Sequence, residues 1–308
     1  MILAMDYQDK FRRLNSASAE AGRKRPHKPC MLLAVIELIE AKRITTNRIE
    51  YNDVLVSRYR GYFEIVKQGN DQLNPWLPFF HLRGDKFWHL IPQVGKEAVL
   101  GAMSTATKRP DIESNVQYAT LDDELFQLLI DPIERDLLRE RLLLHWFPDK
   151  LEPLRNQIGI TEFELALQSG QSNADEQFES PVRSSAFRRL VIEAYDFRCA
   201  ATGWRLILPD YSNLLDAAHI VPFSETADDR PQNGMALTPT FHRALDKGMI
   251  APGPDLKWHV SKMIDRVPDN EPLLALAGEK VRLPREVQYH PDKAALAWRL
   301  AWMESNAS

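Results

Sequence analysis

The sequence predicts an α+β protein with two domains and a linker between them. Around Leu32–Ile39, apolar residues recur three and four positions apart, which is typical of an amphipathic helix. Between Leu214 and Val260 the pattern becomes strand, loop, strand and helix. A small, polar and acidic stretch at residues 168–181 fits neither pattern and predicts a linker. We therefore predict domains at residues 1–167 and 182–308.

The first domain is expected to begin with several helices. The first helix is predicted over Tyr7–Ala21, and a basic loop then leads to Pro29. Proline is well suited to the first turn of a helix, so a second helix should start there. Asn52 or Asp53 is expected to cap a third helix, which runs to about Ile65.

The remainder of this domain adds a sheet element. Two apolar segments, Phe79–Arg83 and Phe87–Ile91, flank Gly84-Asp85-Lys86, and this arrangement predicts a β-hairpin. Two more helices are predicted at Asp122–Leu129 and Ile133–Trp146. The first domain is therefore expected to be α+β with a β-hairpin.

The second domain should begin with a helix over Ser184–Tyr195. Leu214–Val221 is an apolar run typical of a buried strand, and Met235–Leu237 forms a second, short strand. A polar loop with a proline separates the two strands. Thr238-Pro239 then starts a helix, with the threonine as its cap and the proline in its first turn. A closing helix is predicted over Ala294–Met303.

Several polar residues of this pattern suit metal-assisted cleavage of a phosphodiester. An imidazole can take a proton near neutral pH, so His219 on the first strand is the candidate general base. His242 and Asp246 lie four residues apart on one helix face and are candidate ligands for a divalent metal. Asn233 is expected to fix the loop through hydrogen bonds to the backbone and so to orient His219. We count His219, Asn233 and His242 as the catalytic residues.

The motif consists of Ala217–Ile220, Asn233–Leu237, His242 and Asp246–Gly248. It resembles the HNH nuclease motif of the ββα-metal fold, in the form found in bacterial modification-dependent restriction enzymes. The resemblance implies a DNA endonuclease that uses Mg²⁺, Mn²⁺ or another transition ion. In many relatives the residue before the catalytic histidine is also a ligand, but here it is Ala218. Asp216 is the candidate replacement, although it faces away from His219 on an ideal strand and would need a bulge or an irregular strand end.

Composition and cysteine content set further limits. Cys199 stands where some HNH proteins carry a zinc-binding CxxC, but no cysteine accompanies it, so we expect no structural zinc. No apolar run approaches the ~18 residues that a membrane span needs, and no leader of the usual kind is visible, so we expect a bacterial cytoplasmic protein away from membranes. The net charge of −4 argues against a protein coated in nucleic acid, but local patches are allowed. One lies between Lys10 and Lys28, where seven residues are basic and Glu20 alone is acidic.

The first domain carries motifs at His27–Pro29, Pro78–Asp85, Phe87–Trp88 and Trp146–Pro148. Through them it resembles the sulfur-binding domains joined to HNH nucleases in phosphorothioate-dependent restriction enzymes. The resemblance implies binding of double-stranded DNA in which sulfur replaces a non-bridging phosphate oxygen. Sulfur is larger and less strongly hydrated than oxygen, so an apolar rim suits it, and Phe147 and Pro148 are the candidates. The candidates for phosphate and base contacts are Arg25, Lys28, His81 and Arg83.

Simpler interpretations stay open for these residues. The aromatic residues of the second and third motifs could be core residues, and Phe147-Pro148 could be an ordinary helix stop.

The leading prediction is a type IV-like restriction endonuclease that binds phosphorothioated DNA. The alternatives are an HNH endonuclease that reads another modification such as methylcytosine, and a non-catalytic DNA-binding module, which Ala218 keeps open. With one site per chain, a double-strand break would require a homodimer or successive nicks.

Overall fold

The computed structural model describes residues 2–18, 23–169, 180–209 and 211–306. The chain divides into two compact units, Met1–Thr161 and Glu162–Ser308. The division falls within helix α9 (Leu151–Ser169), a little before the domain boundary predicted at residue 167. Most of the linker predicted at 168–181 lies outside the described residues. None of the described helices combines the length and the apolar character needed to cross a membrane.

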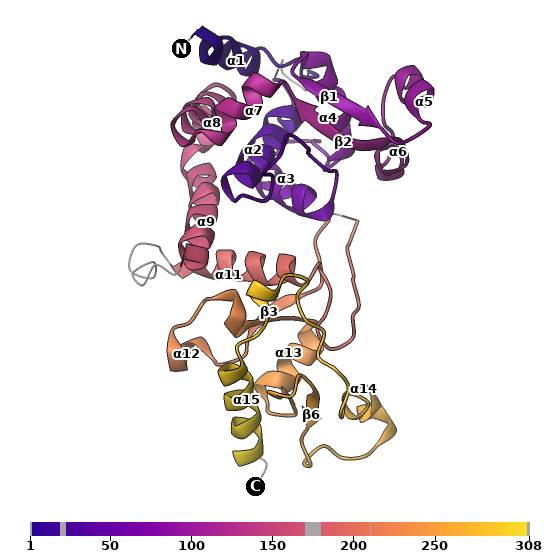
Figure 1. Cartoon of the computed structure of the whole chain (residues 1–308), viewed down its shortest axis with the longest axis vertical. Helices are drawn as coiled ribbons and strands as arrows, with labels where there is room; N and C mark the ends of the chain where they lie inside the picture. The colour runs from indigo at the N-terminus through magenta and orange to yellow at the C-terminus, as the bar shows by residue number, and fades with distance from the viewer. Residues whose placement is uncertain (1, 19–22, 170–179, 210, 307–308) are drawn as a thin grey trace. The chain divides into compact units, whose positions relative to one another are not determined.

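Unit 1 consists of helices and one two-stranded antiparallel sheet (Figure 1). Its strands are β1 (Trp88–Pro92) and β2 (Val116–Leu121), which pair from Trp88↔Leu121 onward. Its helices before α9 are α1 (Ile2–Arg12), α2 (His27–Glu40), α3 (Asp53–Val66), α4 (Trp76–His81), α5 (Glu97–Ala102), α6 (Arg109–Asn115), α7 (Asp123–Ile130) and α8 (Pro132–Trp146). The mixture of helices with a small antiparallel sheet confirms the predicted α+β class.

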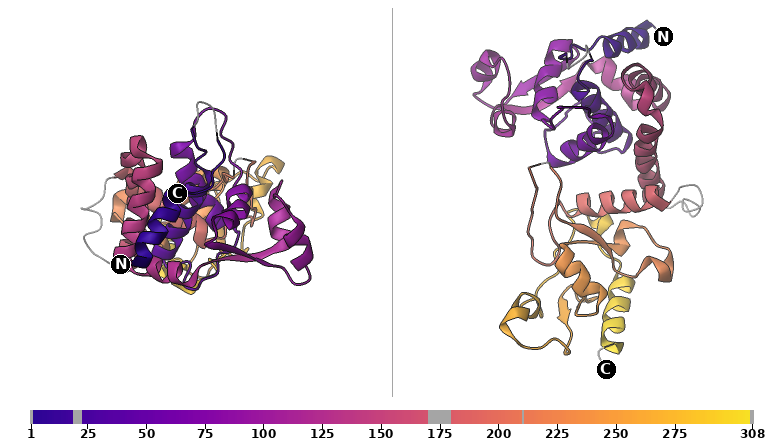
Figure 2. Two further views of the ribbon diagram at one scale, coloured as in Figure 1. Left: turned by 90° about the horizontal axis from the view of Figure 1, so that it is seen from above. Right: turned by 180° about the vertical axis from the view of Figure 1, so that it is seen from behind.

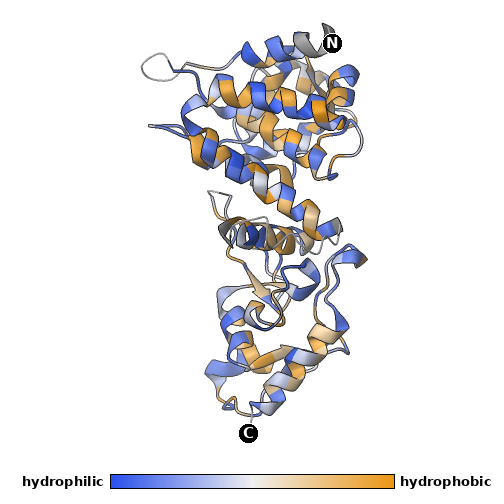
Figure 3. Ribbon diagram, turned by 90° about the vertical axis from the view of Figure 1, so that its left-hand side faces the viewer, coloured by the Kyte–Doolittle hydropathy of each residue, from blue (hydrophilic) through white to orange (hydrophobic). Residues whose placement is uncertain are grey.

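Helix α2 is the centre of the core of unit 1. Every residue from Lys28 to Ile39 is buried, and the helix packs against α3, α4, α7 and α8. A helix that is buried on all sides is typical of a domain centre, so the prediction of a single apolar face was too narrow. Figure 3 shows apolar residues, in orange, alternating with hydrophilic ones, in blue, along the helices of unit 1.

The helix ends follow local signals in some places and tertiary contacts in others. Asn52 caps α3, because its side chain accepts a hydrogen bond from the Leu55 N–H at 3.0 Å. Helix α1 was predicted to reach Ala21 but ends at Arg12. Beyond it the backbone turns toward other parts of unit 1, and the Asn15 N–H donates to Asp85 at 2.7 Å. The Asn15 N–H thus bonds to Asp85 and not to a carbonyl of a longer helix.

The predicted β-hairpin is wrong. Its first segment lies in α4 and in the 3₁₀ turn Leu82–Asp85, and the strand that follows, β1, pairs with β2 far along the chain. Pro75 lies at the N-cap of α4 and Pro78 lies in its first turn, where a missing N–H costs no hydrogen bond. The aromatic residues of both segments are fully buried, as the simpler interpretation held; they are Phe79, Phe80, Phe87 and Trp88.

Unit 2 contains the predicted order of strand, loop, strand and helix. Strand β3 (Asp216–His219) pairs antiparallel with β4 (Gly234–Leu237), and α13 (Pro239–Asp246) follows at once. Thr238 occupies the N-cap of α13 but makes no hydrogen bond with its side chain. The other elements are α11 (Ser180–Ala194), α12 (Phe223–Thr226), β5 (Ile250–Pro252), β6 (Trp258–Val260), α14 (Glu271–Leu274) and α15 (Lys293–Ser305).

Helix α11 lies across the β3–β4 pair (Figures 1 and 2). Gly234 makes this close approach possible. A Cβ atom there would lie 2.3 Å from Cγ2 of Val191 and 3.0 Å from the ring of Phe187. The glycine that follows Asn233 is therefore required by packing, and it brings Phe187 close to the end of β3.

Candidate active site

His219 is the last residue of β3, and two neighbours hold its ring. The ring stacks on Phe187 of α11, with centroids 3.9 Å apart and planes only 6° from parallel. The Nε2 atom lies 2.9 Å from Oδ1 of Asp229, which belongs to the loop between β3 and β4. The side chain of His219 is 25% exposed and that of Asp229 is 7% exposed. The ring therefore has one packed face, one nitrogen that is bonded to a buried carboxylate, and access to solvent.

Asn233 closes the loop that follows His219. It is buried, and its side-chain oxygen accepts from the Val221 N–H at 2.9 Å. Its amide group donates to the Val221 carbonyl at 3.0 Å and to the Asp228 carbonyl at 2.9 Å. These three bonds tie the start of the loop to its end, and they are of the kind expected of a residue that fixes the backbone beside His219.

Arg299 supports the same backbone from helix α15. Its guanidinium is buried and donates to the carbonyl oxygens of His219 and Ile220. It also lies over the rings of Trp298 and Trp302, at 5.4 and 5.2 Å from their centroids. Burial lowers the pKa of Arg299 from its ordinary value, and the charge of Asp246 partly opposes this. A buried arginine thus anchors the end of strand β3.

Sequence reasoning missed Phe187, Asp229 and Arg299. Asp229 had one local signal, because it lies in the loop that Asn233 closes. Phe187 and Arg299 lie far from His219 along the chain, and nothing in their own segments points to it. Their role follows from the packing of α11 and α15.

The proposed metal ligands form a row centred on His242. Its Nδ1 atom lies 3.3 Å from Oδ2 of Asp216, and its Nε2 atom lies 3.5 Å from Oδ2 of Asp246. Asp216 lies two residues before Ala218 on β3, so the two side chains share a face of the strand. The pairing of β3 with β4 is continuous from Asp216 to His219, so the expected bulge is absent. Asp216 reaches His242 from the face of the strand opposite to His219.

One imidazole and two carboxylates fit a divalent ion by their chemistry. The carboxylates, however, approach opposite nitrogens of one ring. In the described part of the chain, no three His, Cys, Asp or Glu side chains are close enough to surround an ion together.

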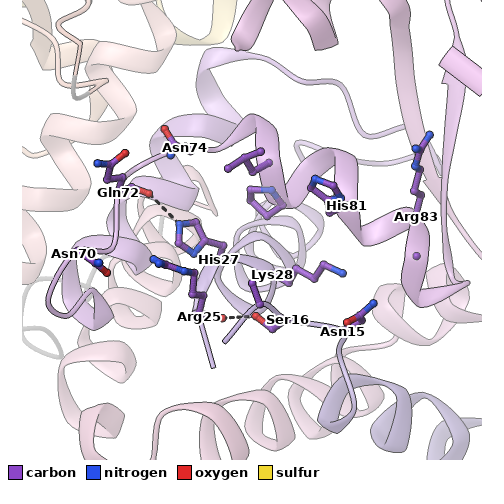
Figure 4. Close-up of a pocket in the computed structure, with 14 residues that line it drawn as sticks. Asn15, Ser16, Arg25, His27, Lys28, Asn70, Gln72, Asn74, His81 and Arg83 are labelled. Atoms are coloured by element: carbon purple, nitrogen blue, oxygen red, sulfur yellow. Dashed lines mark hydrogen bonds between the residues drawn. The ribbon is translucent and has the colours of Figure 1, made fainter. Parts of the chain in front are cut away.

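A cavity of about 770 Å³ lies in unit 1 (Figure 4). Four residues predicted to contact DNA line it, namely Arg25, Lys28, His81 and Arg83. Polar neutral residues complete much of the wall, including Asn15, Ser16, Asn70, Gln72 and Asn74. The structure therefore brings these predicted contacts together on one hollow.

Two of the cations that line this cavity, Lys28 and Arg25, are already paired with carboxylates. Lys28 contacts Asp85 at 2.6 Å, and both side chains are buried. Arg23 and Arg25 contact Asp71 at 2.7 and 2.9 Å. Burial would raise the pKa of Asp71, but hydrogen bonds from Arg23 and from a backbone N–H hold it below its ordinary value. The cavity is therefore less electropositive than its lysine and arginines suggest.

His81 and Arg83 are also engaged. The Nε2 atom of His81 lies 2.9 Å from the Thr105 hydroxyl, and burial together with the charges of Lys28 and Arg83 lowers the pKa of His81. Arg83 lies over the ring of Phe80 at 4.0 Å and donates to backbone carbonyls. Both side chains are thus held in place on the wall.

Phe147 and Pro148 are not part of this cavity. Phe147 ends helix α8, is 7% exposed and packs in the core of unit 1. Pro148 starts the 3₁₀ turn that follows. Phe147 and Pro148 therefore form the end of helix α8, as the simpler interpretation held. Leu77 and Pro78 are the larger apolar residues on the cavity wall.

Comparison with known proteins gives the following matches. The family described as HNH endonuclease matches residues 199–251. A search of curated proteins found no match. A modification-dependent restriction endonuclease, TagI, is 21% identical with a TM-score of 0.32, over 40% of this chain and 39% of that chain. The sulfur-binding domain of SprMcrA, complexed with phosphorothioated DNA, is 19% identical with a TM-score of 0.39, over 52% of this chain and 95% of that chain.

The chain thus spans well under half of TagI. The HNH endonuclease family, in contrast, matches the part of unit 2 that contains the strand pair and helix α13. His219, Asn233, His242 and Asp246 all fall inside the match. Residues 199–251 are therefore an HNH endonuclease domain, and this protein contains a nuclease of the hydrolase class.

Proposed function

We propose that the protein is a modification-dependent restriction endonuclease that binds phosphorothioated DNA and hydrolyses phosphodiester bonds with a divalent metal. The observation that carries the proposal lies in the HNH domain. There, an oriented and partly exposed His219 lies on the strand that also bears Asp216, which contacts His242. These are the donor types that the reaction needs, a base and a set of metal ligands.

His219 is the general base and takes a proton from the attacking water. Phe187 fixes the plane of the imidazole by stacking, and Asn233 and Arg299 hold the backbone on which it stands. His242, with Asp216 or Asp246, would hold the metal ion. When bound, such an ion supplies positive charge that stabilises the transition state and the leaving oxygen.

The contact between Asp216 and His242 favours an enzyme over a non-catalytic DNA-binding module. Ala218 removes a ligand position that relatives use, and this departure is what kept the alternative open. Asp216 places a carboxylate on the same face of β3 and within 3.3 Å of the histidine on α13. The chain thus keeps a strand carboxylate beside its helix ligands.

The cavity of unit 1 is the proposed reader of the modification, with Arg25, Lys28, His81 and Arg83 as contacts. Thiophosphate is less strongly hydrated than phosphate, so its desolvation costs less at a wall where Arg25 and Lys28 are already paired with carboxylates. Leu77 and Pro78 supply apolar surface for the sulfur in place of Phe147 and Pro148.

The lining also favours a backbone reader over a base reader. An enzyme that flips a modified base usually stacks it between aromatic side chains. Among the described residues that line the cavity there is no Phe, Tyr or Trp. The ring of His27 packs against Phe63 and bonds to the Gln72 carbonyl, so it is already engaged.

The test is a pair of duplexes of one sequence, with and without a single phosphorothioate. We expect tighter binding of the modified duplex at low and at moderate salt, because the preference does not arise from charge. We also expect cleavage that needs Mg²⁺ or Mn²⁺, stops on chelation and is abolished in His219→Ala. Equal affinity for the two duplexes at both salts would refute the proposal that unit 1 recognises sulfur, and cleavage by His219→Ala would refute the role of His219 as general base.

Nicked circles that appear before linear plasmid would indicate successive nicks, and their absence would favour a homodimer.

A further inference from the structure

Asp229 makes the only hydrogen bond to the His219 ring among the described residues. Its Oδ1 atom lies 2.9 Å from Nε2, and its side chain is almost wholly buried. We infer that Asp229 is a positioning residue of the nuclease, which keeps the imidazole proton on Nε2 and leaves Nδ1 to accept the proton of water. This inference rests on the proposed role of His219 as general base.

The chemistry of the two groups sets the direction of the bond. A neutral imidazole has one nitrogen that donates and one that accepts, whereas an ionised carboxylate only accepts. The nitrogen that faces Asp229 must therefore carry the proton. Nδ1 then has the free electron pair, so it is the nitrogen that can act as a base.

The carboxylate also matters after proton transfer. When Nδ1 takes a proton from water, the ring becomes an imidazolium with a proton on each nitrogen. Asp229 then accepts a charge-assisted hydrogen bond from Nε2, and its negative charge lies beside the new positive charge. The proton of the water ends on Nδ1. The hydroxide forms a bond to phosphorus while the bond from phosphorus to the leaving oxygen breaks, and that oxygen takes a proton from solvent. Asp229 itself gains no proton.

Neighbours hold the backbone on either side of Asp229. The carbonyl of Asp228 accepts from the buried amide of Asn233, and the carbonyl of Arg230 accepts from the Asn233 N–H at 2.9 Å. The side chains of Asp228 and Arg230 also pair with each other, at 2.8 and 3.0 Å. Asp229 is therefore presented to His219 by a fixed loop.

Phe187 and Asp229 restrain different motions of the same ring. Stacking at 3.9 Å sets the plane of the imidazole but allows either edge to face the loop. The bond to Asp229 selects the edge and the protonated nitrogen. Together they leave one orientation, in which the geometry needed for proton transfer exists before DNA binds.

The decisive substitution is Asp229→Asn, since an amide can donate to Nε2 and stabilise the wrong tautomer. The corresponding change in a serine protease triad lowers kcat by about 10⁴-fold. Because stacking on Phe187 persists here, we expect a loss of at least about tenfold in the rate of single-turnover plasmid cleavage. The affinity for DNA and the Mn²⁺ concentration for half-maximal rate should be unchanged.

Asp255→Asn is the matched control, because it makes the same chemical change in a carboxylate that lies 3.1 Å from Nε2 of another histidine, His259, and takes no part in holding His219 or its loop. We expect wild-type cleavage from it. If wild type cleaves, His219→Ala does not and Asp229→Asn cleaves at the wild-type rate, the inference is overturned while the proposed function stands. If His219→Ala cleaves, the proposed base itself is wrong.

A measurement on the wild type decides the case even if Asp229→Asn fails to fold. Nitrogen NMR of the ¹⁵N-labelled histidine rings reports which nitrogen is protonated, and His219→Gln identifies the signal of His219 among the eight histidines. At a pH where the ring is neutral, we expect a protonated Nε2 and an unprotonated Nδ1. The opposite tautomer would overturn the inference.

Discussion

Arg299→Met tests whether helix α15 holds the end of strand β3. Methionine keeps much of the volume but removes the donors to the His219 and Ile220 carbonyls. A hydrogen bond to a charged group contributes about 1.5–3 kcal/mol, so the two bonds together contribute about 3–6 kcal/mol. Removing the charge also recovers part of the cost of burying it, so we expect a net loss of about 3 kcal/mol.

For a unit of this size, that loss lowers the midpoint of thermal unfolding by roughly 6–12 °C. The assay is calorimetry of the full chain, in which the transition assigned to unit 2 should move. Cleavage measured well below that transition should also fall, because the backbone of His219 loses its anchor. Lys293→Met, which removes an exposed cation from the same helix, is the control and should change neither quantity. An unmoved transition with wild-type cleavage in Arg299→Met would refute the reasoning.

Three further predictions concern the ligands, the cavity and pH. Asp216→Ala and Asp246→Ala test which carboxylate binds the metal together with His242, because loss of that carboxylate should raise the Mn²⁺ concentration for half-maximal cleavage. If both variants titrate like wild type, neither carboxylate is a ligand. Leu77→Asp should abolish the preference for phosphorothioated duplex by placing a carboxylate beside an anion, whereas Phe147→Asp should instead unfold unit 1, which circular dichroism would reveal. The lowered pKa of Asp71 means that its ion pairs stabilise unit 1 above about pH 4, with the contribution lost as pH falls through that lowered pKa. Urea unfolding of Asp71→Asn should therefore differ from wild type at pH 7 and converge with it once the pH has fallen below that lowered pKa, and a constant difference would contradict the assignment.

The nuclease motif was predictable because its signals are local. The apolar run before His219 predicts a strand, and Thr238-Pro239 predicts the start of a helix, so the order of elements follows from neighbours in sequence. The hairpin prediction failed for a related reason. Phe79 and Phe87 are apolar and close in sequence, but prolines turned the first segment into a helix and buried both rings in one core.

The partners of His219 could not be predicted in the same way. Phe187 and Arg299 reach it through the packing of helices that lie far apart in sequence, and no periodicity specifies that contact. Phe147 illustrates the opposite error. Its motif suggested an exposed rim, but an aromatic residue after an amphipathic helix is more easily buried, and the core of unit 1 takes it.

The anchoring of β3 by α15 has a consequence for synthesis on the ribosome. The carbonyl of His219 gains its donor from a residue 80 positions later in the chain. While the polypeptide is still emerging, His219, Asn233 and His242 can already be outside the exit tunnel, yet the arginine that holds the strand end has not been made. The hydrolytic centre therefore matures late in translation, and a nascent chain or a product truncated before Lys293 lacks the support on which its orientation depends.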